Sequence, residues 1–211
     1  MSNRKHIYFS SDLHIGHANV IKYSNRPFRD VDHMYRVLVN NFNSTISKNG
    51  VCYFLGDMGF NNQMLRKFLS ELHMTKILVV GNHDSGYNSL YGAGFDAVMH
   101  GAVMQIAGER VTMSHCPLLG VYREDTTNMR GSTPGENWHK ETKNAKYSFT
   151  NEGQFHLSGH LHSGPNNQNG TKAIEGRQYD IGIDGNNYYP VSISKIESWI
   201  TKTKEKEKGI K

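Results

Sequence analysis

The chain has 211 residues, of which 36% are hydrophobic, and this is enough for one domain with a substantial core. No apolar run approaches the roughly 18 residues of a membrane helix, and the polar N-terminal segment does not resemble a signal peptide. The net charge is +5, but five lysines and two glutamates between Lys202 and Lys211 contribute +3 of it. We interpret residues 202–211 as a frayed basic tail, and the near-neutral remainder is weak evidence for a nucleic-acid partner.

The first 84 residues predict strands that alternate with helices. Apolar runs at 6–11, 51–55 and 77–80 are typical of short buried strands. Helical spacing predicts a short helix after residue 18 and two longer helices over 31–47 and 61–72. Asp30 is expected to cap the helix over 31–47. This alternation indicates parallel strands in an α/β fold.

The second half has a different pattern. Runs at 95–100, 102–107 and 109–114 are separated by single glycines, which predicts antiparallel strands. Residues 120–150 form a long polar segment that we interpret as an extended loop or insertion. Strands are predicted at 155–158 and 179–184, a hairpin-like loop at 163–172, and a final helix from about 193 with Ser194 and Glu197 as its capping box. No repeat or linker divides the chain, so one domain over 1–211 is expected.

Five of the predicted strands end in residues that can bind metal. In an extended chain alternate residues share a face, so an acid and a histidine two positions apart can point to one spot. A single motif of this kind is weak evidence, because Asn-His-Asp also suits a turn. All five, each after an apolar run, are a strong signal: Asp12-x-His14, Gly56-Asp57, Gly81-Asn82-His83-Asp84, Ser114-His115 and Gly159-His160-x-His162.

This set of motifs resembles the calcineurin-like metallophosphoesterases over residues 7–162. A small subgroup of predicted bacterial and phage phosphoesterases is similar over a wider range, which includes 11–28, 114–118 and 182–192. Ser114 departs from the pattern, since the family often has glycine there, and the 120–150 segment looks longer than usual for the subgroup. The resemblance implies a four-layer αββα sandwich of two mixed β-sheets flanked by helices.

The resemblance also implies a site with two divalent transition-metal ions, Mn²⁺ first, with Fe, Zn or Ni as alternatives. Aspartate and neutral imidazole are ligands that suit these ions. One ion would be held by Asp12, His14 and His162, the second by Asn82, His115 and His160, and both by Asp57. His83 would bind no metal and would face the phosphate as an acid or charge stabiliser.

Three further residues are weaker candidates for the site. Asp84 could orient His83 as part of the catalytic group or serve as structural support. His17 lies close to the first motif and could touch substrate. Arg26 could bind phosphate or could equally brace its loop. In the long loop, Trp138 and His139 could cover the site or belong to an ordinary surface loop.

The predicted function is hydrolysis of a phosphodiester or phosphomonoester bond by a metal-activated hydroxide. We expect a small, nucleotide-type substrate, and we favour the diester because an imidazole suits protonation of a poor leaving group. Two alternatives stay open: a non-catalytic binding or scaffold protein with the same fold, and a nuclease that acts on polymeric nucleic acid. Cys52 and Cys116 are expected to be free thiols in a reducing cytoplasm. The oligomeric state is not indicated.

Overall fold

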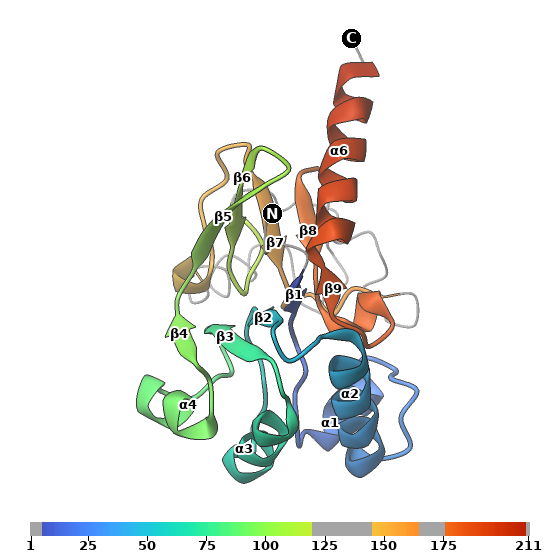
Figure 1. Ribbon diagram of the computed structural model, residues 1–211, viewed down its shortest axis with the longest axis vertical. Helices are drawn as coiled ribbons and strands as arrows, with labels where there is room; N and C mark the ends of the chain where they lie inside the picture. The colour runs from blue at the N-terminus through green and yellow to red at the C-terminus, as the bar shows by residue number, and fades with distance from the viewer. Residues whose placement is uncertain (1–5, 120–144, 165–175, 210–211) are drawn as a thin grey trace, which may run out of the picture.

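The structure is a computed structural model, and it describes residues 6–119, 145–164 and 176–209 (Figure 1). Within these residues two mixed sheets pack face to face and helices flank them. The predicted α/β sandwich is confirmed. No helix in these ranges combines the length and the apolar character needed to cross a membrane.

The five-stranded sheet has the order β4-β3-β2-β1-β9. β1 (Ile7–Ser10), β2 (Val51–Phe54) and β3 (Thr75–Val79) are parallel, as predicted. β4 (Ala97–Met99) also pairs parallel to β3, so the prediction of an antiparallel strand at 95–100 is wrong. The reason is a helix that the prediction missed, α4 (Tyr87–Ala93), which makes the crossover that parallel neighbours need. β9 (Val191–Ser192) closes the other edge antiparallel to β1.

The four-stranded sheet has the order β5-β6-β7-β8. β5 (Ala102–Ile106) and β6 (Glu109–Met113) form the predicted antiparallel hairpin, and β7 (Phe155–Ser158) and β8 (Gln178–Asp180) follow in parallel. The last strand is shorter than the predicted 179–184. The Gly182 amide donates to Asp180 Oδ1 at 2.7 Å, and the chain then turns into the 3₁₀ helix η3 (Ile183–Asn186).

Four helices match predicted ones: α1 (Ala18–Tyr23), α2 (Val31–Thr45), α3 (Asn62–Glu71) and α6 (Ile193–Gly209). Asp30 caps α2 as expected, since its Oδ1 accepts from the His33 amide at 2.7 Å. The cap of α6 is not Ser194. The Oγ of Ser192 accepts from the Lys195 amide at 3.3 Å, because the helix begins directly after β9.

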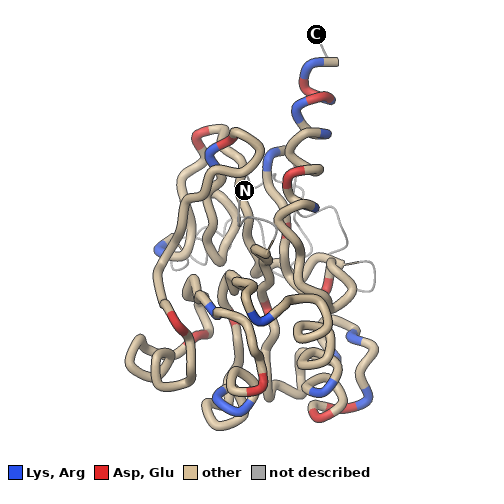
Figure 2. The backbone as a smooth tube through the Cα atoms, in the orientation of Figure 1, with Lys and Arg blue, Asp and Glu red and all other residues tan. Residues whose placement is uncertain are grey.

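The described part of the basic tail is the exposed end of α6, which continues to Gly209. Two ion pairs hold it: Lys204 binds Glu109 on β6, and Arg177 makes a bidentate contact with Glu207 at 2.7 and 2.8 Å. Figure 2 shows lysine and glutamate alternating along this helix, which projects from the body.

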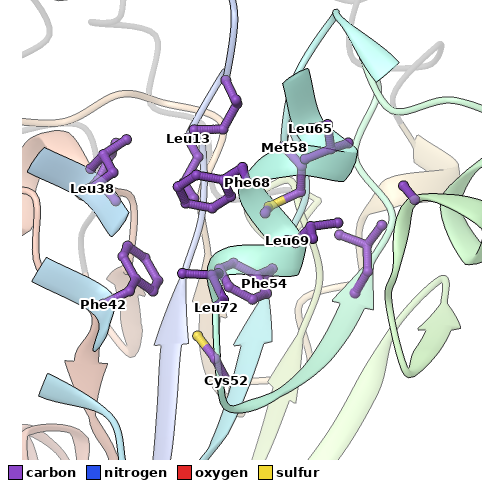
Figure 3. Close-up of a cluster of buried hydrophobic side chains, with 14 of the residues drawn as sticks. Leu13, Leu38, Phe42, Cys52, Phe54, Met58, Leu65, Phe68, Leu69 and Leu72 are labelled. Atoms are coloured by element: carbon purple, nitrogen blue, oxygen red, sulfur yellow. The ribbon is translucent and has the colours of Figure 1, made fainter. Parts of the chain in front are cut away.

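Two hydrophobic layers hold the sandwich together. The first lies between the helices and the outer face of the five-stranded sheet, and Figure 3 shows Phe42, Phe54 and Phe68 at its centre. The second lies between the sheets, and Ile196 and Ile200 of α6 extend it. Each fully buried side chain of this size contributes about 1.5–3 kcal/mol, so these layers fix the positions of the strand ends that carry the polar motifs.

Candidate functional site

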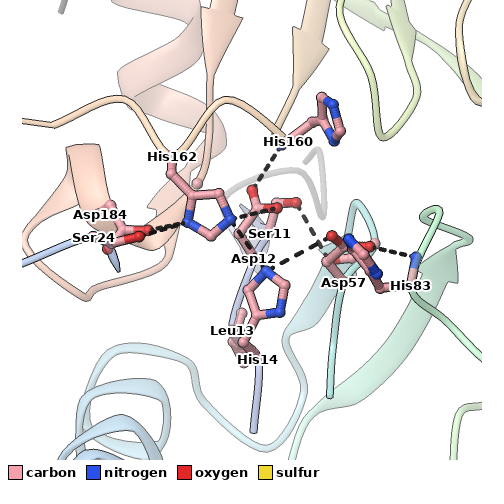
Figure 4. A network of polar contacts seen from close by, with 12 residues as sticks. Ser11, Asp12, Leu13, His14, Ser24, Asp57, His83, His160, His162 and Asp184 are labelled. Carbon is pink, nitrogen blue, oxygen red and sulfur yellow. Dashed lines mark hydrogen bonds and ion pairs between the residues drawn. The ribbon is translucent and has the colours of Figure 1, made fainter. Parts of the chain in front are cut away.

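The five predicted motifs meet at one edge of the sandwich. Parallel strands place their carboxyl ends at a common edge, and the segments after β1, β2, β3, β6 and β7 all arrive there. Figure 4 shows the ring of His162 between Asp12 and Asp184, with His14 and Asp57 beside it. The backbone amides of Asp12 and His14 donate to the carbonyls of Gly56 and Asp57, so the first two motifs are also joined directly.

The first cluster consists of Asp12, His14 and His162. One potential ligand atom from each lies within 4.8 Å of the others. The Nε2 atoms of His14 and His162 face each other at 3.1 Å, and His162 Nε2 lies 3.9 Å from Asp12 Oδ1. This is the trio that the motifs predicted for one ion.

The second cluster consists of Asn82, His115 and His160. His115 Nε2 lies 2.8 Å from Asn82 Oδ1 and 3.2 Å from His160 Nδ1. Cys116 and His160 also lie within 4.8 Å of His115, although the motifs did not single out the cysteine. Burial raises the pKa of its thiol to about 12, so the thiol would have to lose a proton to bind a cation.

Asp57 lies between the two clusters. Its Oδ2 is 3.7 Å from His14 Nε2 in the first, and its Oδ1 is 3.4 Å from His115 Nε2 in the second. Oδ1 also accepts from the His83 amide at 3.0 Å. The carboxylate therefore presents one oxygen to each cluster.

The protonation states of the predicted ligands differ. Against the effect of burial, the charge of Asp57 raises the pKa of His115 to about 9, so this ring is charged at pH 7 and would release a proton on binding a cation. Burial lowers the pKa of His14 to about 2 and that of His160 to about 3, so both rings are neutral ligands at pH 7.

Burial raises the pKa of Asp12 to about 6 and outweighs the attraction of His162 and His115. Its Oδ1 atom is buried without a hydrogen-bond partner. A buried carboxylate oxygen of this kind is stabilised when a cation lies next to it.

Backbone strain is concentrated in the clusters. Five residues in or between the clusters have a positive, left-handed φ, which residues other than glycine adopt uncommonly. They are Asp12 (60°), His14 (50°), Asp57 (54°), His160 (70°) and His162 (50°). Each such conformation costs on the order of 1–3 kcal/mol and persists only where the surroundings enforce it. This pattern is typical of a functional site.

Two glycines of the motifs are required by close packing. A Cβ atom on Gly81 would lie 2.5 Å from Asp57 Oδ1, and one on Gly159 would lie 2.3 Å from Asp12 Oδ2. Both distances are too short for real atoms. The glycines therefore let the backbone come next to the two carboxylates.

The prediction that Arg26 binds phosphate is wrong, and the alternative that it braces the loop is confirmed. Its side chain is fully buried, and Nε and Nη2 donate to Asp184 at 2.8 and 2.9 Å. Nη1 and Nη2 also donate to the carbonyls of Leu13 and Asp12. Asp184 in turn lies 2.8 Å from Nδ1 of His162. Sequence patterns did not reveal this pair, because its partners are 158 residues apart.

Asp84 also has a structural role rather than a catalytic one. Its carboxylate accepts from the backbone amides of Asp57, Met58 and Gly81 at 3.0, 2.9 and 2.8 Å. These bonds join the ends of β2 and β3 and leave the carboxylate no contact with the ring of His83. The structural option that the motif left open is the one observed.

The remaining predicted residues lie at the margin of the clusters. His83 is exposed, and its ring centroid is 6.1 Å from that of His14. The half-buried ring of His17 lies 5.7 Å from His14. Both remain candidates for substrate contact. Trp138 and His139 lie outside the described residues.

Comparison with known proteins supports the fold but not an activity. No known protein-family profile matches the chain. An uncharacterized protein of Methanocaldococcus jannaschii is 41% identical over 87 residues, which cover 40% of this chain and 49% of that protein, so the match spans only about half of the relative. The gene 66 protein of Mycobacterium phage L5 is 27% identical over 188 residues, covering 84% of this chain and 86% of the phage protein. The crystal structure of a protein of unknown function from Aquifex aeolicus has a similar fold, with a TM-score of 0.64, 25% identity, and coverage of 92% of this chain and 98% of that one.

Proposed function

We propose that the chain is a metal-dependent phosphoesterase whose site holds two divalent transition-metal ions. The observation that carries the proposal is the position of Asp57, with Oδ2 toward His14 and Oδ1 toward His115. A carboxylate can bridge two ions because it has two oxygens. The fit of the residues to cations is supported by the neutral rings of His14 and His160, and by Asp12 Oδ1, which is buried without a hydrogen-bond partner.

The donor set favours particular ions. Imidazole nitrogen together with carboxylate and amide oxygen suits Mn²⁺, Fe, Zn or Ni more than Mg²⁺ or Ca²⁺. Asp12, His14 and His162 would hold one ion, Asn82, His115 and His160 the other. When bound, two such ions neutralise phosphate charge and activate water for attack. We propose Mn²⁺ as the first ion to test.

The chain's own residues would do the remaining work. The exposed ring of His83 lies at the edge of the clusters, where it can reach a phosphoester from solvent. There it would donate a proton to the leaving oxygen or stabilise its charge. We propose a small nucleotide-type phosphoester as substrate, with a preference for the diester. The buried free thiols Cys52 and Cys116 fit the proposed location in a reducing cytoplasm.

Metal removal and replacement test this proposal. Protein stripped with a chelator is expected to lose hydrolysis of bis-p-nitrophenyl phosphate and p-nitrophenyl phosphate, and Mn²⁺ is expected to restore it better than Mg²⁺. Metal content is measured in parallel by elemental analysis, with two ions per chain expected. Faster turnover of the diester would support the proposed preference. No turnover with Mn²⁺, Ni²⁺, Zn²⁺ or Mg²⁺ would favour the scaffold alternative.

A second prediction concerns the buried pair of Arg26 and Asp184. Asp184→Asn keeps the shape of the side chain but removes the charge that faces His162 Nδ1. Partners behind a metal-binding histidine fix its orientation, and their loss typically weakens metal affinity by about 10–100-fold. We expect that decrease in Mn²⁺ affinity by calorimetry. Glu207→Gln alters an exposed bidentate pair with Arg177 and is the matched control, for which unchanged affinity is expected. Equal affinities in both variants would contradict the positioning role.

A further inference from the structure

Four aromatic rings form a row beside the ligand clusters. Ring centroids are 6.2 Å apart for Tyr23 and His17, 4.6 Å for His17 and Phe60, and 5.2 Å for Phe60 and His83. Phe60 also lies nearly parallel to the ring of His14, at 5.7 Å and 15°. We call these four residues, Tyr23, His17, Phe60 and His83, the aromatic rim. Its middle rings, His17 and Phe60, lie beside His14 of the first cluster, and it ends at the proposed proton donor, His83.

Phe60 is unusual in its exposure. Of the nine phenylalanines, all within the described residues, only Phe60 is among the exposed large hydrophobic side chains, at 50%. At the other end of the rim, Tyr23 is 51% exposed. Water therefore covers apolar ring surface directly beside the polar clusters, and a ligand that covers this surface would gain hydrophobic free energy.

The position of Phe60 is fixed by the backbone. The Ile15 amide donates to the Met58 carbonyl at 2.8 Å, and residues 15 and 59 form a β-bridge. The two chain segments joined by this bridge lie very close together. A Cβ atom on Gly59 would be only 2.6 Å from the Ile15 carbonyl oxygen. On the other side, Asn61 caps α3 by accepting from the Met64 amide. Phe60 is thus held between two anchored residues, and little ordering is needed when a ligand binds.

We infer that the aromatic rim is a stacking subsite for a nucleobase carried by the phosphoester substrate. This inference rests on the proposed function, including its nucleotide-type substrate, and adds the place where the base would bind. A phosphate at the clusters would place its ester substituent near His14 and His83, and Phe60 contacts both rings. Phenylalanine offers a π-face but no hydrogen-bonding group, so it would favour a planar base without selecting its identity. An alkyl or sugar ester would leave the exposed ring in water.

The test compares two diesters with the same leaving group, p-nitrophenol: thymidine 5′-(p-nitrophenyl phosphate) and methyl p-nitrophenyl phosphate. The ratio of their kcat/KM values isolates the contribution of the nucleoside. Base stacking on an aromatic side chain is worth about 1–3 kcal/mol, so Phe60→Leu is expected to lower this ratio about tenfold or more. Phe60→Trp is expected to keep the wild-type ratio of kcat/KM values, because tryptophan also offers a π-face for stacking. Tyr91→Leu removes an equally exposed ring, at 51%, from α4, which carries no predicted ligand, and should leave the ratio unchanged.

Equilibrium binding keeps the inference separate from catalysis. The Mn²⁺-loaded protein is titrated with thymidine 5′-monophosphate and with methyl phosphate, and the nucleotide is expected to bind about tenfold more tightly unless Phe60 is replaced by leucine. Absence of turnover together with this binding difference would contradict the phosphoesterase proposal and support the subsite. Turnover with the same ratio in wild type, Phe60→Leu and Tyr91→Leu would overturn the subsite and leave the phosphoesterase proposal standing. Equal binding of both ligands to the wild-type protein would also overturn it.

Discussion

Asp57→Asn is expected to reduce hydrolysis of bis-p-nitrophenyl phosphate by about a thousandfold, and to lower the metal content below two ions per chain. The amide keeps the size of the side chain but has no charge. Only one of its two polar atoms, the oxygen, can bind a metal ion. The two oxygens that now face His14 and His115 could no longer serve both clusters. Turnover and elemental analysis on the same preparation measure the two effects together.

The control for this variant must show that the fold is intact. Asp57 is buried and its Oδ1 accepts from the His83 amide, a bond that the amide oxygen of asparagine can also accept. We therefore expect an unchanged circular dichroism spectrum. Asp96→Asn, at a carboxylate that accepts from the Lys76 amide away from the clusters, should keep both activity and metal. Two bound ions with full turnover in Asp57→Asn would refute the bridging role.

His83→Ala is also expected to lose turnover, but to retain the metal ions. The side chain is exposed and its ring is not part of either cluster, so its removal should disturb neither folding nor binding of the ions. General acid catalysis contributes about 100–10,000-fold, and a loss in this range is expected for esters with a poor leaving group. For p-nitrophenyl esters the loss should be smaller, because p-nitrophenolate leaves without a proton.

The dependence on the leaving group separates the roles proposed for His83. A larger loss with an alkyl leaving group indicates proton donation, whereas an equal loss with both leaving groups indicates charge stabilisation. His100→Ala removes another exposed histidine, which packs against Tyr87, and serves as the matched control. Full turnover by His83→Ala of esters with either leaving group would exclude His83 from the reaction. Full turnover by Asp57→Asn as well would refute the assignment of the two clusters as the site of hydrolysis.

Much of the fold could be predicted because its signals are local. The apolar runs before Asp12, Asp57 and Asn82 are strands, and the helical spacing between them correctly indicated parallel pairing. The prediction failed where the local pattern was short or ambiguous. α4 has only two buried residues, Leu90 and Ala93, so its periodicity could not be detected and β4 was assigned to the wrong pairing.

The gathering of the candidate ligand residues could be predicted for a similar reason. The seven candidates each lie within four residues of the end of a strand, so their place in the sequence marks them: Asp12, His14, Asp57, Asn82, His115, His160 and His162. That they meet could be expected from parallel strands that share an edge. The left-handed backbone conformations of five of them could not be expected from the sequence, because any residue other than glycine adopts them uncommonly: Asp12, His14, Asp57, His160 and His162.

Local sequence patterns indicated most of the strands and the potential metal ligands near their ends, because both depend on neighbouring residues. The roles of the supporting residues became clear only from the three-dimensional contacts. Arg26 faces inward because Asp184, 158 positions away, arrives beside it, and Asp84 turns from His83 to the amides of another strand end. Phe60 became a candidate for substrate binding through its exposure beside His14 and His83. Burial and pairing of this kind depend on contacts distant in sequence, which no local pattern records.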